Sequence, residues 1–186
     1  MSIRTKTLLI IFIPILIVIV LIYIASRTIL LDGFARMEED KVRTDVGRAV
    51  SVLKQELSNL DTMTHDWAWW DDTYDFVVNP NETYIQTNLV DDSFLNFRLN
   101  LMIFTNSAGD IVYSKAFDLK SEKEIPVPNS VMTYLSYHDT KLLQHSNSES
   151  SLKGVIMLPE GPMLVAATPI LTSEGKDPMH GTLIWG

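Results

Sequence analysis

The residues best suited to chemistry lie in one stretch of twelve, from His65 to Phe76. It contains three of the four tryptophans of the chain, together with four carboxylates. If the stretch is helical, a rotation of about 100° per residue places four residues on one face: Trp67, Trp70, Asp71 and Tyr74. A carboxylate among rings is costly unless it accepts hydrogen bonds. It could accept them from ring N–H and O–H groups and fix the packing, or it could help to bind a polar ligand.

A metal centre is the weaker interpretation of the same residues. The four histidines are scattered along the chain, and no H-E-x-x-H pattern occurs. Asp71 and Asp72 diverge by about 100° on a helix, so one ion is not easily bound by both. A calcium site that uses Asp71, Asp72 and Asp75 stays open, because carboxylate oxygens suit this ion. No serine nucleophile elbow or phosphate-binding glycine loop is present, so we predict neither an enzyme nor a cofactor.

The same stretch resembles the signature of a known family. The pattern Asp66-Trp67-Ala68-x-Trp70-Asp71-Asp72-Thr73-Tyr74-x-Phe76 is similar to that of the fourth class of CHASE domains, which are extracytoplasmic sensor domains of prokaryotic receptors. The resemblance runs from about Asp45 to the last residue. It implies the PAS-like fold of the Cache superfamily, in which a small ligand sits between the central sheet and the helices that cover it.

By this resemblance, the aromatic stretch would form one wall of a ligand site, and residues on or beside the first two strands would form the other. The guanidinium of Arg98 suits a carboxylate or phosphate group of a ligand. The alternative is a solvated Arg98, or one paired with Asp91 or Asp92. The predicted ligand-binding residues are Trp67, Trp70, Asp71, Tyr74, Arg98 and Tyr113, with Phe104 as a further candidate.

A membrane-spanning helix precedes these residues. Residues 8–25 carry no charge and are mainly Ile, Leu and Val; as a helix they would extend about 27 Å, enough for a bilayer. A cleaved signal peptide is the alternative, but the apolar run is longer than a usual signal core and Ile24-Ala25-Ser26 is a poor cleavage site. We therefore expect an uncleaved anchor at residues 8–25 after a cytoplasmic tail of residues 1–7.

The orientation of this anchor rests mainly on the resemblance, which implies that the globular part lies outside the cell membrane. The basic residues agree only mildly, since Arg4 and Lys6 precede the anchor and Arg27 follows it closely.

A long helix is expected to join the membrane to the aromatic stretch. Residues 26–63 contain no proline, and their apolar residues step by three and four: Val42, Val46, Ala49, Val50, Leu53, Leu57 and Leu60. Such a face can lie on a sheet or pair with a second copy. We expect residues 29–46 to pair, which predicts a homodimer. The predicted organisation is a membrane-proximal helix at residues 26–44 and a sensor domain at residues 45–186.

The remainder predicts an antiparallel sheet of about five strands. Residues 99–104 and 111–117 surround a glycine-containing turn, residues 154–158 and 163–168 surround Pro159-Glu160-Gly161-Pro162, and residues 180–185 form a last strand. Residues 84–97 suggest a short helix with a loop, residues 120–129 a loop, and residues 130–143 a surface helix. The fold class is therefore α+β, with helices on one side of the sheet. Asn81-Glu82-Thr83 matches the pattern for N-glycosylation.

Composition excludes several classes of partner and chemistry. The net charge is −8, and the acidic excess lies beyond the anchor. This argues against nucleic acid and anionic lipid as partners of the globular part. The chain has no cysteine, so disulfides, thiolate metal sites and cysteine nucleophiles are excluded.

Taken together, the sequence predicts a membrane-anchored extracytoplasmic sensor domain. An unknown small-molecule ligand would favour one packing of sheet against helices, and the long helix would pass the difference to the membrane. By the resemblance, the output is a kinase or cyclase domain, or another protein, outside this chain. The alternative is a structural or protein-interaction module of the same fold without a small-molecule ligand. That alternative predicts a filled core beside Asp71, whereas a sensor predicts a cavity there.

Overall fold

The computed structural model describes residues 3–136, 141–176 and 178–186, and of residues 30–36 it describes the backbone alone. The chain forms two compact units, Met1–Val52 and Leu53–Gly186. The first unit is helical and contains an apolar segment, Ile3–Ile29, that is long enough to cross a membrane. Its side chains are exposed, as expected for a helix whose apolar surface meets lipid or another chain.

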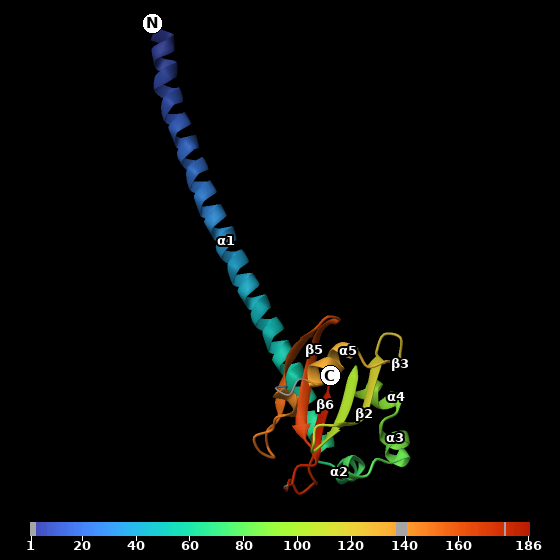
Figure 1. The fold of residues 1–186 in the computed structure, drawn as a ribbon. Coiled ribbons are helices and arrows are strands. Elements are labelled where there is room, and N and C mark those ends of the chain that lie inside the picture. Colours follow the sequence, from blue (N-terminus) through green and yellow to red (C-terminus); the bar gives the residue numbers. More distant parts are fainter. Residues whose placement is uncertain (1–2, 137–140, 177) are drawn as a thin grey trace. The chain divides into compact units, whose positions relative to one another are not determined.

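Helix α1 (Ile3–Ala68) is one continuous helix of 66 residues (Figure 1). The predicted anchor and the predicted long helix are therefore parts of one element. Pro14 lies within it, in the apolar segment, where a membrane helix tolerates proline. The last turns belong to the second unit, where Leu60, Thr64 and Ala68 are buried in the core.

The helix does not continue through the aromatic stretch, and this corrects the sequence prediction. Helix α1 ends at Ala68 and α2 (Asp71–Val78) begins three residues later, with Trp70 in an extended conformation between them. A helix start at Asp71 is locally favourable, because the acidic residues Asp71 and Asp72 then lie in the first turn, at the positive end of the helix dipole. The four residues predicted to share one helical face therefore lie on two separate helices and the turn between them.

Two short helices follow. Helix α3 (Glu82–Asn88) is capped by the Asn81 side chain, which accepts a hydrogen bond from the Tyr84 N–H at 2.9 Å. Helix α4 (Asp91–Phe97) is followed by its C-cap residue Arg98, which adopts a left-handed conformation with φ of 56°. The predicted helix and loop at residues 84–97 are thus two helices.

The sheet has six antiparallel strands in the order β3-β2-β1-β6-β5-β4. Both predicted hairpins form, and β6 pairs with β1 on one side and β5 on the other. The strands are β1 (Leu101–Asn106), β2 (Ile111–Asp118), β3 (Lys123–Ile125), β4 (Leu152–Leu158), β5 (Gly161–Pro169) and β6 (Gly181–Trp185). The α+β class is confirmed. The sixth strand, β3, is a short and exposed edge strand in the segment predicted as a loop.

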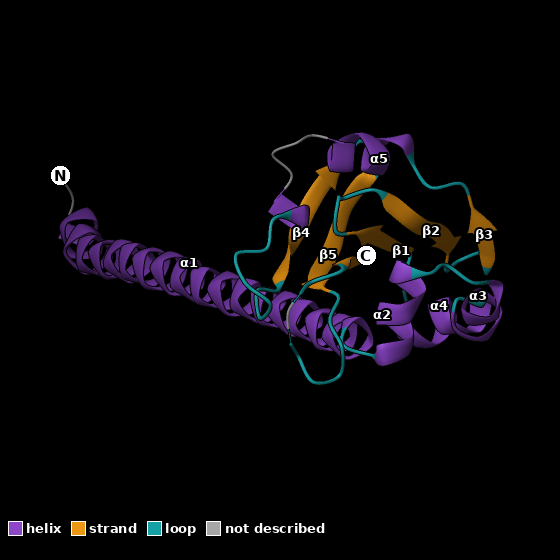
Figure 2. Ribbon diagram, turned by 60° about the horizontal axis from the view of Figure 1, so that its bottom comes forward, coloured by secondary structure: helices purple, strands orange, loops and turns teal. Residues whose placement is uncertain are grey.

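Both faces of the sheet are covered, not one (Figure 2). On one face, Phe104, Met102 and Trp185 pack against the end of α1 and against α2 to α4. On the other, Ile103 and Ile184 pack against α5 (Asn129–Ser136) and the 3-10 helix η1 (Lys141–Leu143). Apolar residues therefore occur at successive strand positions, since successive side chains point to opposite faces. Residues 137–140 of the predicted helix at 130–143 lie outside the described residues.

The connection between β5 and β6 binds the turn between α1 and α2. Leu171 N–H donates to the Ala68 carbonyl at 3.1 Å. The Asp71 carboxylate accepts from the Ser173 N–H at 2.8 Å and from the Ser173 hydroxyl at 2.9 Å.

Gly175 completes this contact, because its φ of 64° is left-handed and an added Cβ would lie 2.7 Å from the Trp69 ring. A residue without a side chain is required for that close approach. The aromatic stretch thus serves as the docking surface for a loop about one hundred residues later in the chain.

We predict that Asp71→Ala lowers the melting temperature more than Asp72→Ala. Both side chains lie in the first turn of α2, so their interaction with the helix dipole is matched, but the described hydrogen bonds to Ser173 involve Asp71 alone. The hydrogen bonds from the backbone and then the side chain of Ser173 lower the pKa of Asp71. The difference in melting temperature between the two variants should therefore reach its full size above the usual aspartate pKa of about 3.9. It should disappear as the pH falls through the lowered pKa of Asp71 in the folded state. Equal melting temperatures at neutral pH would contradict this role.

Candidate functional site

The structure does not gather the six predicted ligand-binding residues around one cavity. Two of them, Trp67 and Trp70, belong to a ring cluster between helices and sheet. The Trp67 ring lies 6.1 Å from that of Trp70, 5.5 Å from Phe97 and 5.2 Å from Trp185. Trp185 is fully buried, whereas Trp70 is 40% exposed at the edge of the cluster. These contacts are those of packed aromatic side chains, at the separations that aromatic pairs prefer.

Asp71 and Tyr74 face the connection between β5 and β6. The carboxylate of Asp71 is exposed and bound to Ser173, so the prediction that it lies among indole and phenol rings is wrong. The reason is the helix break, which turns Asp71 away from Trp67. The Tyr74 ring packs against His180, with ring centres 4.4 Å apart.

Tyr113 belongs to the same aromatic core as Trp67, whereas Arg98 is not part of it. Tyr113 on β2 packs beside Phe76 and Phe104, and its burial raises the pKa of its hydroxyl. Arg98 is exposed; its backbone N–H donates to the Leu95 carbonyl at 3.3 Å, and within the described residues its guanidinium has neither a hydrogen bond nor an ion pair. The proposed partner Asp91 instead binds the buried ammonium of Lys115 at 2.6 Å. The ligand-binding role of the six residues stays a prediction.

The acidic residues of α2 also separate. Asp72 and Asp75 line a cavity of about 340 Å³ next to Asn81, but Asp71 is not among its lining residues. Among residues 3–136, 141–176 and 178–186, no group of three His, Cys, Asp or Glu side chains is placed to hold a metal ion.

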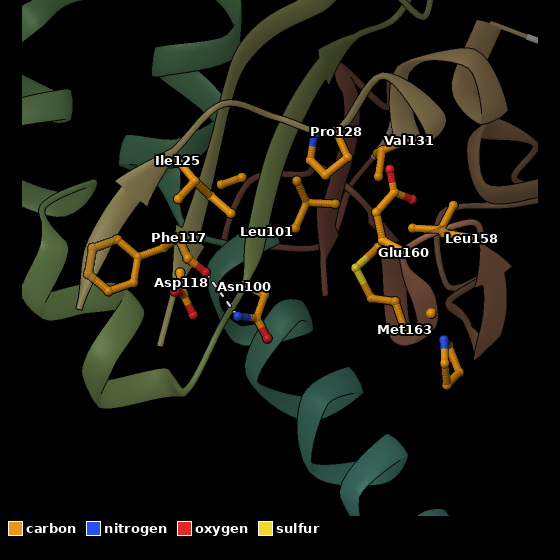
Figure 3. Close-up of a pocket in the computed structure, with 13 residues that line it drawn as sticks. Asn100, Leu101, Phe117, Asp118, Ile125, Pro128, Val131, Leu158, Glu160 and Met163 are labelled. Carbon is orange, nitrogen blue, oxygen red and sulfur yellow. Dashed lines mark hydrogen bonds between the residues drawn. The ribbon is translucent and has the colours of Figure 1, made fainter. Parts of the chain in front are cut away.

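A second cavity, of about 420 Å³, lies on the other face of the sheet (Figure 3). Its volume falls within the range of small-molecule sites. Buried Leu101 and Ala116 contribute from the central strands, and Val131 contributes from α5. Ile125 of β3 lies on one side, and the β4–β5 hairpin supplies further lining: Leu158, Glu160, Gly161, Pro162 and Met163.

Three polar side chains line this cavity, which we call the hairpin cavity. The Asn100 amide group donates to the Phe117 carbonyl at 2.9 Å, which leaves its oxygen free to accept. The Asp118 carboxylate accepts from the Ser121 hydroxyl at 2.7 Å and the Lys120 N–H at 3.0 Å, and these bonds lower its pKa. The Glu160 carboxylate accepts from the Ser130 hydroxyl at 2.7 Å. Figure 3 shows Asn100 and Asp118 on one side and Glu160 on the other.

Sequence reasoning missed these residues: Asn100 was placed inside the strand predicted at residues 99–104, although β1 begins at Leu101, and Asp118 and Glu160 lie beside or within turns that looked ordinary. Glu160 was placed in a four-residue turn, but β4 ends at Leu158 and β5 begins at Gly161, so the turn is only Pro159-Glu160. No local signal marks such a residue. Only the order of the strands brings Asp118 and Glu160 to the same cavity.

An ion pair joins α1 to the edge strand that leads into this hairpin. The Asp61 carboxylate accepts a hydrogen bond from the Ser151 hydroxyl and one from the Lys153 ammonium, the latter at 2.7 Å. Lys153 lies on β4. The Asp61 side chain is 20% exposed and that of Lys153 is 43% exposed, so the pair is partly shielded from solvent.

Comparison with known proteins identifies the globular unit. The sequence profile of the CHASE4 domain matches residues 52–186. The chain is 36% identical over 150 residues to the methanogenesis regulatory histidine kinase FilI of Methanothrix harundinacea, covering 81% of this chain and 17% of that protein. The chain therefore spans about a sixth of the length of this relative.

Two solved structures share the fold. One is the extracellular domain of vpHK1S-Z8, described as a histidine kinase, with a TM-score of 0.54, 14% identity and coverage of 79% of this chain and 57% of the other. The second is a domain of a sensory box/GGDEF family protein from Vibrio parahaemolyticus, with a TM-score of 0.50, 13% identity and coverage of 79% and 60%. The family match and the signature residues agree, and the chain belongs to the CHASE4 family of sensor domains.

Proposed function

We propose that this chain is the sensing part of a membrane-bound signalling receptor. The amino terminus lies in the cytoplasm, the apolar segment of α1 crosses the membrane, and the globular unit lies outside. A small molecule binds the globular unit and displaces α1. The output is a kinase, a cyclase or a separate signalling protein. The similarity to a histidine kinase over 81% of the chain supports this class of output.

The observation that carries this proposal is the continuity of α1. The segment long enough to cross a membrane and the turns that pack in the sensor core belong to one helix, Ile3–Ala68. A helix is held by its own hydrogen bonds from turn to turn, so a shift or rotation at its packed end reaches the rest of the element. Helix shifts of this kind are an established form of switching.

The ion pair of Asp61 supplies the contact through which the sheet acts on α1. Asp61 is held by Ser151 and Lys153, and β4 continues from Lys153 into the hairpin that lines the hairpin cavity. A ligand that binds one position of this hairpin better than another biases the position of β4. The shift is limited by the difference in affinity between the two states, with about tenfold for each 1.4 kcal/mol.

The rival is a structural or protein-interaction module of the same fold. The surroundings of Asp71 favour such a module over a ligand site there. Ser173 satisfies the Asp71 carboxylate, and none of the cavities described above is lined by Asp71. The hairpin cavity favours sensing, because it combines an apolar lining with three polar groups.

We also propose that α1 pairs with the α1 of a second copy. Val42 and Val46 are each 56% exposed and Val50 is 44% exposed, although they continue the apolar spacing of the buried part of the helix. An apolar stripe on a helix gains free energy when it is covered, and a second copy offers a matching stripe.

Cysteine cross-linking tests this pairing cleanly, because the natural chain has no cysteine. Val46→Cys should form a disulfide-linked dimer in membranes after mild oxidation, since a bridge needs Cα atoms within about 7 Å. Arg48→Cys, about 200° further round the helix, is the matched control and should cross-link weakly. Equal cross-linking at both positions would contradict a defined interface.

Removal of the Asp61 link should loosen β4. We expect Asp61→Ala to lower the free energy of unfolding by about 1 kcal/mol, the usual scale for a partly exposed charged hydrogen bond, and to speed hydrogen exchange of β4 amides. Glu56→Ala, an exposed acidic position on the same helix, should change neither. An unchanged hydrogen-exchange rate of the β4 amides in Asp61→Ala would contradict a role of Asp61 in holding β4.

A thermal-shift screen of the purified chain tests sensing itself. The compounds are small acids, amino acids, amines and divalent ions. A ligand that binds only the folded state stabilises it by about 2.7 kcal/mol at one hundred times its dissociation constant, so at least one class should raise the melting temperature. No response to any class would favour the structural module.

A further inference from the structure

We propose that the hairpin cavity binds an organic cation, an ammonium group on a short apolar body. The proposal rests on the proposed sensing function and names the ligand class for it. It does not involve the ring cluster or Asp71.

The polar side chains that line the cavity favour a ligand that donates hydrogen bonds. Of the thirteen residues that line the cavity, three have polar side chains, and all three offer acceptors: Asn100, Asp118 and Glu160. The one side-chain donor among them, the Asn100 amide, is already bound to the Phe117 carbonyl at 2.9 Å. Within the part of the chain that the structure describes, the lining includes no Lys, Arg, His, Ser, Thr, Tyr or Trp. A ligand must therefore bring the donors, and an ammonium group brings up to three.

The charge of the cavity lining also favours a cation. Among the described residues, two carboxylates and no cationic side chain line the cavity. The hydroxyl of Ser121, followed by the backbone of Lys120, lowers the pKa of Asp118, which keeps it ionised at neutral pH. Lys123 lies opposite Asp118 in the β2–β3 pairing, and the charge of Lys120 also lowers the pKa of Asp118. Both lysines are exposed, and neither is among the described lining residues. An anionic ligand would meet like charge on two sides, whereas a cation forms charge-assisted hydrogen bonds.

The apolar surface between the carboxylates favours a ligand with an apolar body. Leu101 and Val131 are buried, with exposures of 2% and 3%, yet both line the cavity. Met163 adds a flexible thioether that adapts to the shape of a ligand. This surface excludes a bare metal ion as the best occupant, because an ion gains nothing from apolar contact. It suits a short aliphatic or aromatic body attached to the ammonium group.

The position of the carboxylates connects this site to signalling. Asp118 is the last residue of β2, and Glu160 lies in the β4–β5 turn. A cation between them attracts β2 and the β4–β5 hairpin, which are otherwise separated by β1 and β6. The β4–β5 hairpin includes Lys153, the partner of Asp61 on α1. Occupancy therefore acts on the same strand that is tied to the helix.

The test uses three probes of matched shape: isopentylammonium, isopentyl alcohol and 4-methylpentanoate. Binding to the full-length chain in detergent is measured by calorimetry and by thermal shift. The ammonium probe should bind and raise the melting temperature, the alcohol should bind more weakly, and the carboxylate should not bind. Asp118→Asn and Glu160→Gln should each weaken ammonium binding by about tenfold, a change equivalent to the loss of one charged contact.

Matched controls separate the site from a general effect of charge. Asp110→Asn removes an exposed carboxylate at the other hairpin turn and should leave binding unchanged. The melting temperatures of the unliganded Asn and Gln variants report whether they fold. These variants keep the size of the side chain but replace one acceptor oxygen with an amide donor, so Asp118→Asn should melt somewhat lower, because one of its two accepted hydrogen bonds is lost, while remaining folded.

Three results would overturn the proposal. Ammonium binding that both variants leave intact would show that the cation lies elsewhere. Preference for the carboxylate probe would reverse the ligand class. Absence of binding by all three probes at millimolar concentration would remove the site. In each case, a hit of another class in the wider thermal-shift screen would leave the sensing function standing, and the absence of any hit would remove both.

Discussion

The central position of β6 is the constraint on which the rest of the globular unit depends. This last strand pairs with β1 and β5, so it joins two hairpins that the sequence builds separately. The first residue of β6 must be glycine, because Gly181 has a φ of 152° and an added Cβ would overlap the Thr105 carbonyl oxygen. Once β6 is in place, Trp185 faces the ring cluster and Ile184 faces the opposite core. The two faces of one strand therefore organise both the helix contacts and the surface beside which the hairpin cavity forms.

The two faces have different tasks. On the first, the signature residues of the family join helices to sheet: Trp67 packs on Trp185, and Asp71 holds the β5–β6 connection through Ser173. On the second, short helices leave room for a cavity whose polar groups are acceptors. In the proposed switch, a ligand on the second face changes the position of a hairpin while the packing of the first face is kept.

The sequence predicts the elements of this fold better than their contacts. Hydrophobic periodicity located α1 and both hairpins, since those signals are local. The break between Ala68 and Asp71 was missed, because it is stabilised by Ser173 and Gly175, about one hundred residues later. The acidic start of α2 was the available signal. Asp118 and Glu160 were missed for the same reason, since strand order alone makes them neighbours of one cavity. The family signature identified the domain correctly, and its Trp67 packs against Trp185 in the ring cluster.

Signalling as proposed requires that the hairpin cavity is coupled to α1 through β4. The most direct measurement is the distance between spin labels at two introduced cysteines, one replacing exposed Gln55 on α1 and one replacing exposed Met157 on β4, recorded with and without a saturating ammonium probe. The account predicts a shifted distance distribution on binding, and no shift when Asp61→Ala is also present. An unchanged distribution in the natural background, with the probe bound, would contradict it.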